Sequence, residues 1–366
     1  MPHYLFDTNI GKVVLSWQDD QLKGVALATR GLHITKSKTP TWVKDIAKKI
    51  RQHLQGKYCD FDDLPLDLSS FTEFQKMVYR GCQDIGVGET LSYGELAKVI
   101  GRPRAARAVG TALKKNLFPI VIPCHRVLAA GRKLGGFSAP GSTCTKYRLL
   151  QIEKAKVANV DEEIVRWDEG VKMLGKKDKK LKNAMQKIGT FHLEKSSAHS
   201  LFESLAMSIV FQQLATAAAR AIWRRFCELF PRNIPTPKQV MRCDEETLRG
   251  AGLSRNKMLA IRDLAQKTLQ GDIINDDAKL TAMTDAEIIE SLTQVRGIGR
   301  WTVQMLLIFY LRRLDVFPED DYGIRKGFAI LYDLAELPTP KEMRNAAQEW
   351  QPYRSIASWY LWRLTD

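Results

Sequence analysis

A cysteine followed directly by a histidine, in Pro123-Cys124-His125-Arg126, is the first candidate for chemistry in this sequence. A thiol attacks only as the thiolate, so a nucleophilic cysteine needs a nearby base or positive charge. His125 supplies a base as the next residue, and Pro123 restricts the backbone before the nucleophile. Taken alone, a buried cysteine beside a histidine is more often an ordinary core residue. The neighbouring sequence must decide between these two interpretations.

A second candidate combines a glycine turn with acidic residues. Gly297-Ile298-Gly299 is followed, beyond a helix-like segment, by the sequence FPEDDY at 317–322. Gly297 and Gly299 permit a tight turn, after which backbone N–H groups at the start of the next helix can face a phosphate. A Gly-x-Gly on its own is weak evidence. An aspartate shortly after the ensuing helix makes the combination more specific.

Composition indicates a multidomain protein with an acidic partner. The chain has 366 residues, of which 45% are hydrophobic, enough for two or three folded cores. Its 56 Lys and Arg against 41 Asp and Glu give a net charge of +15, which favours nucleic acid or an anionic membrane face. The alternative is that the charge serves solubility alone, but solubility requires a smaller net charge than this. No apolar run is long enough to cross a bilayer, and residues 1–20 lack the pattern of a signal peptide.

The six cysteines are scattered and include no Cys-x-x-Cys pair, which argues against a disulfide framework, a zinc ribbon or an iron–sulfur loop. His3, His33, His53 and Cys59 show no recognisable ligand spacing, so we expect neither a metal nor another cofactor. A free thiol at Cys124 requires a reducing compartment. We therefore expect an intracellular protein, in the cytoplasm and nucleoid, or in the nucleus of a eukaryote.

Local patterns predict mixed structure in the first part of the chain and helices afterwards. Residues 13–17 and 22–27 flank an Asp-Asp turn and predict a hairpin, and residues 42–54 have helical periodicity. Helices are expected at 74–85, 94–100, 105–115 and 145–155. The second and third of these, joined by Gly101-Arg102-Pro103, form a helix-turn-helix candidate. Residues 201–229 are expected to form one long helix or a helix pair, and further helices are expected at 245–252, 257–270, 285–292 and 301–311.

A lysine-rich stretch at 172–187 marks a change in composition and the expected junction between the two halves. One interpretation is a solvated helix face or connector. The other is a segment that follows the phosphates of a nucleic acid.

The surroundings of Cys124 settle the first candidate. Over residues 70–155 the chain closely resembles the O6-alkylguanine-DNA alkyltransferase family, on these motifs in this order: YGELA at 93–97, RAARAVG at 104–110, Asn116, IVIPCHRV at 120–127, Gly135-Gly136 and KYRLL at 146–150.

The resemblance implies the roles of four residues in alkyl transfer. Cys124 accepts the alkyl carbon from guanine O6 by direct displacement, and His125 takes the thiol proton through a water. Glu153, one helix later, holds the imidazole tautomer, in a base-and-orienter arrangement. Tyr93 donates to the guanine ring as negative charge develops on it. Because a thioether does not hydrolyse readily, the protein is consumed in a single turnover.

The resemblance also implies how DNA is held. Arg107 fills the space that the extruded base leaves in the duplex, and Asn116 braces the active-site turn. The small residues at 105, 106, 108, 110 and 112 suit a helix pressed against DNA, although alanines also simply favour helix. Residues 1–68 match no pattern in this family that we can identify.

Over residues 195–362 the chain resembles the AlkA-type 3-methyladenine DNA glycosylases of the helix-hairpin-helix superfamily. The matching motifs are SIVFQQL at 208–214, LRGAGL at 248–253, RGIGRWT at 296–302, FPEDDYGIRK at 317–326 and WQPYRS at 350–355.

This resemblance assigns Asp321 as the carboxylate that stabilises an oxocarbenium-like sugar, while Asp320 is expected to face solvent or cap a helix. Lyases of the superfamily carry a lysine just after the hairpin, where this chain has Trp301. We therefore expect monofunctional cleavage that leaves an abasic site. Trp301, Trp362 and Tyr322 are candidates for an aromatic cleft that holds a cationic base.

For four residues of this region, an ordinary core position is the alternative interpretation. Aromatic residues at helical spacing are more often core residues, and we assign Trp359 to the core; the same alternative stays open for Trp301 and Trp362. Leu214 resembles the wedge that enters the stack as the nucleotide leaves, or is an ordinary buried leucine.

These observations predict an α+β multidomain protein. We expect a small N-terminal α/β unit (1–68), a winged helix-turn-helix-like alkyltransferase domain (69–156), a lysine-rich linker (157–187) and an all-α helix-hairpin-helix glycosylase domain (188–366). The expected partner is double-stranded alkylated DNA, bound by a monomer without membrane association. Two alternative functions are an alkylation-responsive transcriptional regulator and a non-catalytic DNA-binding scaffold. The first requires promoter-selective binding, and the second is disfavoured by the intact candidate catalytic residues.

Overall fold

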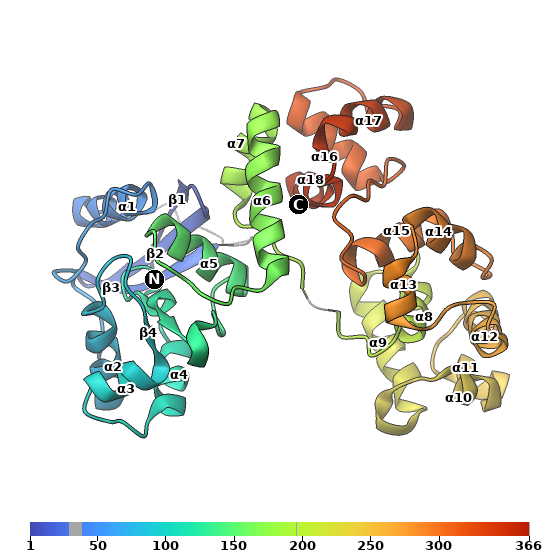
Figure 1. Ribbon diagram of the computed structural model, residues 1–366, viewed down its shortest axis with the longest axis horizontal. Coiled ribbons are helices and arrows are strands. Elements are labelled where there is room, and N and C mark those ends of the chain that lie inside the picture. Colours follow the sequence, from blue (N-terminus) through green and yellow to red (C-terminus); the bar gives the residue numbers. More distant parts are fainter. Residues whose placement is uncertain (29–38, 195, 366) are drawn as a thin grey trace. The chain divides into compact units, whose positions relative to one another are not determined.

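The computed structural model describes residues 1–28, 39–194 and 196–365 (Figure 1). These divide into two compact units, of which unit 1 comprises Met1–His192, Lys326–Leu337 and Trp359–Asp366, and unit 2 comprises Leu193–Arg325 and Pro338–Ser358. The predicted α+β multidomain class is confirmed. His33 lies outside the described residues. Across the described ranges, no helix has both the length and the apolar character that crossing a bilayer requires.

Unit 1 begins with an antiparallel sheet of order β1-β2-β3, from strands β1 (His3–Thr8), β2 (Gly11–Gln18) and β3 (Gln21–Ala28). The predicted hairpin is β2–β3, and its turn residues Asp19 and Asp20 adopt the positive φ angles that tight hairpins require. Helix α1 (Thr41–Leu54) buries one face, which includes Val43, Ile46 and Ile50, in the same core as the strands. The sheet and α1 together form the predicted α/β unit.

The chain continues through α2 (Glu73–Gln83), β4 (Leu91–Ser92), α3 (Tyr93–Val99), α4 (Ala106–Lys114), β5 (Val127–Leu128) and α5 (Ser142–Ile152). The helix-turn-helix candidate is formed by α3 and α4. Helix α3 begins with a reciprocal capping box between Ser92 and Glu95, which stops the helix from extending backwards into β4. β4 pairs in parallel with β5, Leu91 opposite Val127. This short ladder holds the start of α3 beside the turn that carries Cys124.

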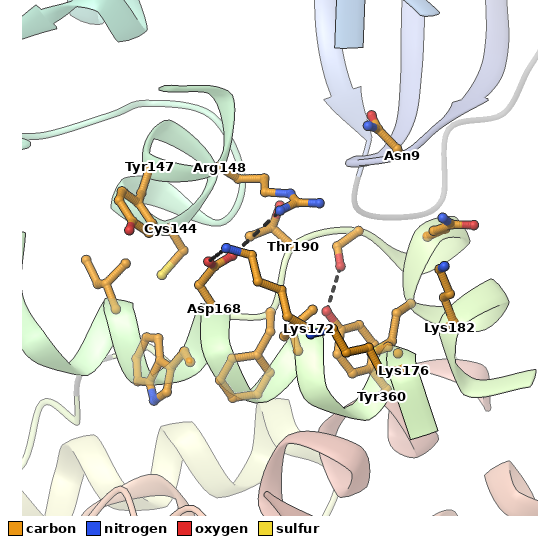
Figure 2. Close-up of a pocket in the computed structure, with 18 of the residues that line it drawn as sticks. Asn9, Cys144, Tyr147, Arg148, Asp168, Lys172, Lys176, Lys182, Thr190 and Tyr360 are labelled. Atoms are coloured by element: carbon orange, nitrogen blue, oxygen red, sulfur yellow. Dashed lines mark hydrogen bonds and ion pairs between the residues drawn. The ribbon is translucent and has the colours of Figure 1, made fainter. Parts of the chain in front are cut away.

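The lysine-rich stretch is helical. Residues 157–187, expected as a linker, contain α6 (Glu162–Lys177) and α7 (Lys179–Ile188), which form part of unit 1. A cavity of about 500 Å³ lies among α5, α6 and α7, and the lysines at 172, 176, 179 and 182 are exposed at its edge. Figure 2 shows Asp168 beside Arg148 and Lys172. The carboxylate oxygens of Asp168 lie 3.7 Å from Arg148 Nη1 and 2.5 Å from Lys172 Nζ. This arrangement favours the solvated-helix interpretation of the stretch.

The described residues of unit 2 form helices and loops. The remaining helices of the chain are α8 (Leu201–Phe211), α9 (Thr216–Glu228), α10 (Pro237–Arg242), α11 (Glu245–Gly250), α12 (Arg255–Gln270), α13 (Asp277–Ala282), α14 (Asp285–Thr293), α15 (Arg300–Phe309), α16 (Tyr322–Tyr332), α17 (Pro340–Ala346) and α18 (Arg354–Leu364). Residues 201–229 are a helix pair rather than one helix, because Gln213 adopts φ +55° between α8 and α9. Helix α12 starts at a Ser254 cap and ends at Gly271 in the left-handed conformation.

Candidate active sites

Cys124 opens a short 3-10 helix, Cys124–Arg126, directly before β5. Its side chain is almost fully buried, and the structure places Asn116 against it. The Asn116 side-chain amide donates to the Ile122 carbonyl at 2.9 Å and lies 3.2 Å from the Cys124 sulfur. Its oxygen accepts from the Phe118 N–H at 2.9 Å. Asn116 therefore fixes the loop that precedes the nucleophile and directs a donor at its sulfur.

A cavity of about 320 Å³ opens in front of the thiol. Cys124 lines it together with Tyr93 from α3, Gly110 from α4, and Phe137 and Ser138 from the loop before α5. Burial raises the pKa of Tyr93, so its hydroxyl stays protonated and can donate a hydrogen bond. The cavity thus presents a thiol, a phenolic donor and the side chain of Phe137, an arrangement that suits a flat base.

Behind the thiol lies a buried polar network centred on Glu153. Arg126 donates to this carboxylate with Nε at 2.9 Å and Nη2 at 2.8 Å, and His53 Nε2 lies 2.9 Å from Oε1. His125 Nε2 lies 3.1 Å from the same oxygen, within ion-pair distance but without good hydrogen-bond alignment. His125 Nδ1 forms no hydrogen bond with any other described residue. One buried carboxylate therefore serves two histidines and an arginine.

The electrostatics of this network define its resting state. Burial tends to raise the pKa of Glu153, but the adjacent His125 and the hydrogen bonds from His53 and Arg126 hold it well below its usual range. Burial lowers the pKa of His125 despite Glu153, and burial raises the pKa of Cys124 despite the Asn116 hydrogen bond. The resting site therefore contains a thiol, a neutral imidazole and a carboxylate.

Sequence reasoning missed three residues here. Arg126 stands in the cysteine motif but received no role, and His53 was considered only as a metal ligand. Lys146 also stood in a matching motif. It is fully buried, donates to the Val127 carbonyl at 2.6 Å, and burial lowers its pKa to about 8. The apolar residues Leu149 and Leu150 that follow Lys146 in KYRLL were the available signal for its burial; the contact of His53 has no local signal.

Helix α4 presents the candidate DNA-binding face. Val109, Ala112 and Leu113 are buried, whereas Arg107 and Ala108 are exposed. A small exposed side chain lets a duplex approach this helix closely.

In unit 2 the structure brings Trp301 and Asp321 together. Asp321 precedes α16, and its Oδ1 accepts from the Ile324 N–H at 2.8 Å. Its Oδ2 accepts from Trp301 Nε1 at 2.7 Å. Asp320 is exposed, as expected, and Asp321 is half-buried. Trp301 and Tyr322 are 47% and 64% exposed, so both rings remain accessible beside the carboxylate.

Trp359 and Trp362, the other two tryptophans considered for the aromatic cleft, belong to unit 1. Trp359 is buried against Phe191 and Tyr360, at ring-centroid distances of 5.2 and 5.0 Å, which confirms it as a core residue. Trp362 is half-buried, and its predicted place in an aromatic cleft stays a prediction.

The glycine hairpin joins α14 to α15. Gly297 adopts φ +76°, a conformation that side chains rarely tolerate. Gly299 has an ordinary φ of −98°, and a Cβ there would meet no atom within 4 Å. The protein's own structure therefore does not require glycine at 299, and the open space there leaves the backbone N–H groups at the start of α15 accessible.

The loop that carries Leu214 is bonded to this hairpin through Gln212. Gln212 Nε2 donates to the Gly297 carbonyl at 2.9 Å, and Lys257 Nζ donates to the Val210 and Gln212 carbonyls at 2.7 and 2.8 Å. These bonds fix the loop that carries Leu214. Leu214 is 40% exposed, so the interpretation as an ordinary buried leucine is wrong. The roles of Gln212 and Lys257 were not foreseen, because all three hydrogen bonds are long-range.

A buried Cys–His–Glu network below a helix-turn-helix, and an aspartate beside a helix-hairpin-helix turn, define two classes of DNA-repair protein in one chain. The family model described as "6-O-methylguanine DNA methyltransferase, DNA binding domain" matches residues 73–155, and the "HhH-GPD superfamily base excision DNA repair protein" model matches residues 206–352. Both matches fall within the ranges that the sequence predicted. The chain therefore belongs to the alkyltransferase family in its N-terminal part and to the HhH-GPD superfamily in its C-terminal part.

Individual relatives agree with this assignment. DNA-3-methyladenine glycosylase 1 of Schizosaccharomyces pombe is 36% identical over 190 residues, which are 51% of this chain and 83% of that protein. The methylated-DNA–protein-cysteine methyltransferase of Mycolicibacterium paratuberculosis is 36% identical over 151 residues, 40% of this chain and 89% of that protein. The solved structure of an S. pombe 3-methyladenine DNA glycosylase in complex with abasic DNA has a TM-score of 0.50 and 35% identity, covering 53% of this chain and 95% of that one.

Proposed function

We propose that this protein repairs alkylated DNA by two chemistries, and that Cys124 and Asp321 carry them. The observation that supports the first is the thiol of Cys124 at the base of a cavity, with a buried His125–Glu153 pair behind it. The second rests on Asp321 lying against Trp301 beside the hairpin. Both sites suit a nucleotide extruded from the duplex.

In the first reaction, the sulfur of Cys124 forms a bond to the alkyl carbon as the bond from that carbon to guanine O6 breaks. The thiol proton passes through a water to His125, whose depressed pKa keeps it neutral and ready to accept. Glu153 then stabilises the imidazolium, and Tyr93 donates to the guanine as negative charge develops on the ring. The products are a thioether on Cys124, a protonated His125 and a guanine anion, which takes up one proton from water to become unmodified guanine.

In the second reaction, the bond between an N-alkylated purine and its sugar breaks. The purine is already cationic and leaves as a neutral base, so the barrier lies in the sugar cation that remains. Asp321 stabilises this cation electrostatically until water adds to it. Trp301 and Tyr322 offer accessible rings for the cationic base. Because Trp301 stands where a lyase has lysine, no Schiff base forms and an abasic site is left.

DNA is the shared substrate. The net charge of +15 favours double-stranded DNA, and the related glycosylase structure was solved with DNA bound. Arg107 fills the gap left by the base at the first site and Leu214 does so at the second, while Gly297 and Gly299 admit the phosphate backbone. A monomer suffices for both reactions, since each site is built within one chain. Charge and chemistry both fit a compartment that holds the genome.

A paired assay on the wild type, Cys124→Ser and Asp321→Asn tests this proposal. Wild-type protein should gain one methyl group on the Cys124 peptide when incubated with O6-methylguanine duplex, and should release free bases from N-alkylated DNA. Cys124→Ser should lose only the first activity and Asp321→Asn only the second. Promoter-selective binding that changes on alkylation, without base release, would instead indicate a regulator.

A further inference from the structure

His53 connects the N-terminal α/β unit to the alkyl-transfer network. It lies near the end of α1, 100 residues before Glu153, and only 1% of its surface is exposed. Its ring packs against Tyr58 and Phe61, with centroids 5.9 and 5.3 Å away. A histidine buried this completely is fixed in orientation by its surroundings.

Both ring nitrogens of His53 have a partner, and together the partners determine its tautomer. The backbone N–H of Cys59 lies 3.3 Å from Nδ1. Because a backbone N–H can only donate, Nδ1 accepts and carries no proton. The proton is therefore on Nε2, which donates to Glu153 Oε1 at 2.9 Å. His53 is a neutral donor to the carboxylate that faces the catalytic base.

We propose that His53 is a positioning residue for alkyl transfer, which makes the N-terminal unit a part of the catalytic apparatus. This inference rests on the proposed alkyl transfer to Cys124. Arg126 engages both oxygens of Glu153, and His53 adds a second direction of constraint on Oε1, the oxygen that also faces His125. The carboxylate therefore cannot rotate away from the imidazole during proton transfer.

His53 also moderates the charge that His125 meets. The ionisable groups around His125 and Glu153 come from several elements: His53 from α1, Cys82 from α2, Cys124 and Arg126 from the active-site turn, and Lys146 from α5. Of the two described side chains that hydrogen-bond to Glu153, Arg126 is charged, so His53 is the one that can be replaced without removing a formal charge. Without the His53 hydrogen bond, the negative charge on Glu153 is less well compensated. The pKa of His125 then rises, so His125 stays protonated and cannot act as a base up to a higher pH.

Single-turnover methyl transfer from an O6-methylguanine duplex tests this role. His53→Phe keeps an aromatic ring against Tyr58 and Phe61 but removes both hydrogen bonds. His53→Gln keeps an amide N–H for Glu153 and an oxygen for Cys59. His3→Leu is the matched control, because His3 lies in the same unit and bonds only to Ser16 among the described residues.

We expect His53→Phe to slow the rate constant by on the order of 10- to 100-fold and to move the acid limb of its pH profile to higher pH. His53→Gln should recover most of the rate, and His3→Leu should match the wild type. Base release from N-alkylated DNA by the same preparations should be unchanged in all three variants.

Two results would overturn the inference. One is a His53→Phe variant with the wild-type rate constant and acid limb. The other is a lower labelled fraction of Cys124 with an unchanged rate constant in that fraction, which indicates a purely structural role. Should His53→Phe not fold, a folded His53→Gln that is slow without any movement of its acid limb would overturn it equally. A wild type that transfers no methyl group would refute the proposed alkyl transfer itself.

Discussion

Replacing Lys146 by methionine should change how the stability of the alkyltransferase part depends on pH. Lys146 is fully buried, and its ammonium donates to backbone carbonyls but faces no carboxylate in direct contact among the described residues. Burial lowers its pKa from the ordinary value of 10.5 to about 8. The folded protein therefore disfavours the charged form, and this lysine opposes folding at neutral pH.

The size and sign of the effect follow from the difference in the pKa of Lys146 between the folded and the unfolded protein. About 2.5 pH units separate the unfolded and folded pKa values, and each is worth 1.36 kcal/mol, so the ammonium costs about 3 kcal/mol below pH 8. Between about pH 8 and 10.5 the unfolded chain binds more protons than the folded one. The free energy of unfolding therefore rises with pH across this window, and the penalty disappears above it.

The assay compares the wild type with Lys146→Met in urea between pH 7 and 10.5. After equilibration at each pH, the buried Cys82 thiol in α2 is pulse-labelled at one fixed pH, which reports the unfolding of the alkyltransferase part alone. The difference in unfolding free energy between wild type and variant should move by about 3 kcal/mol in favour of the wild type as the pH rises. Using the difference cancels other groups that titrate in the window. A difference that stays constant with pH would refute the assignment of Lys146 as a buried, charged lysine at neutral pH.

Further substitutions test the remaining structural arguments. Glu153→Gln leaves Arg126 buried without its carboxylate, so thermal unfolding at pH 7 should show a loss of about 3–5 kcal/mol. Because the pKa of Glu153 is depressed, that loss should shrink as the pH falls below its usual range, and a loss independent of pH would contradict the pairing. Gly299→Ala should melt like the wild type yet bind DNA more weakly, whereas Gly297→Ala, at φ +76°, should lose about 1–2 kcal/mol in the same melt. Leu214→Ala should change stability by less than about 0.5 kcal/mol but slow base release, and an unaffected release rate would rule out its role as a wedge.

Local features of the fold were predictable because short-range chemistry determines them. The Asp19-Asp20 turn fixes the β2–β3 hairpin, and the Ser92–Glu95 capping box fixes the start of α3. Periodicity placed most helices to within a few residues. It left open whether residues 201–229 form one long helix or a helix pair, because the positive φ of Gln213 that divides them has no signal in the periodicity. The domain boundaries that the sequence suggested stay predictions, since the compact units follow spatial contacts rather than the two family ranges.

The candidate sites were predictable only where motif residues meet each other. Cys124, His125 and Asn116 lie close in the chain, so one motif contains them. Nothing in the sequence around His53 indicates Glu153, because folding of α1 against the alkyltransferase core creates that contact. The same holds for the bonds that tie the Leu214 loop to the hairpin. Long-range pairs of this kind depend on packing that no local pattern specifies.

The central claim is that two unlike side chains of one protein act on two classes of alkylated base. Its most direct test is to follow, in one mixture, methylation of the Cys124 peptide and release of 3-methyladenine by wild type, Cys124→Ser and Asp321→Asn. We predict that each substitution abolishes one signal and leaves the other at the wild-type level. A wild-type protein that neither becomes methylated at Cys124 nor releases modified bases would contradict the account.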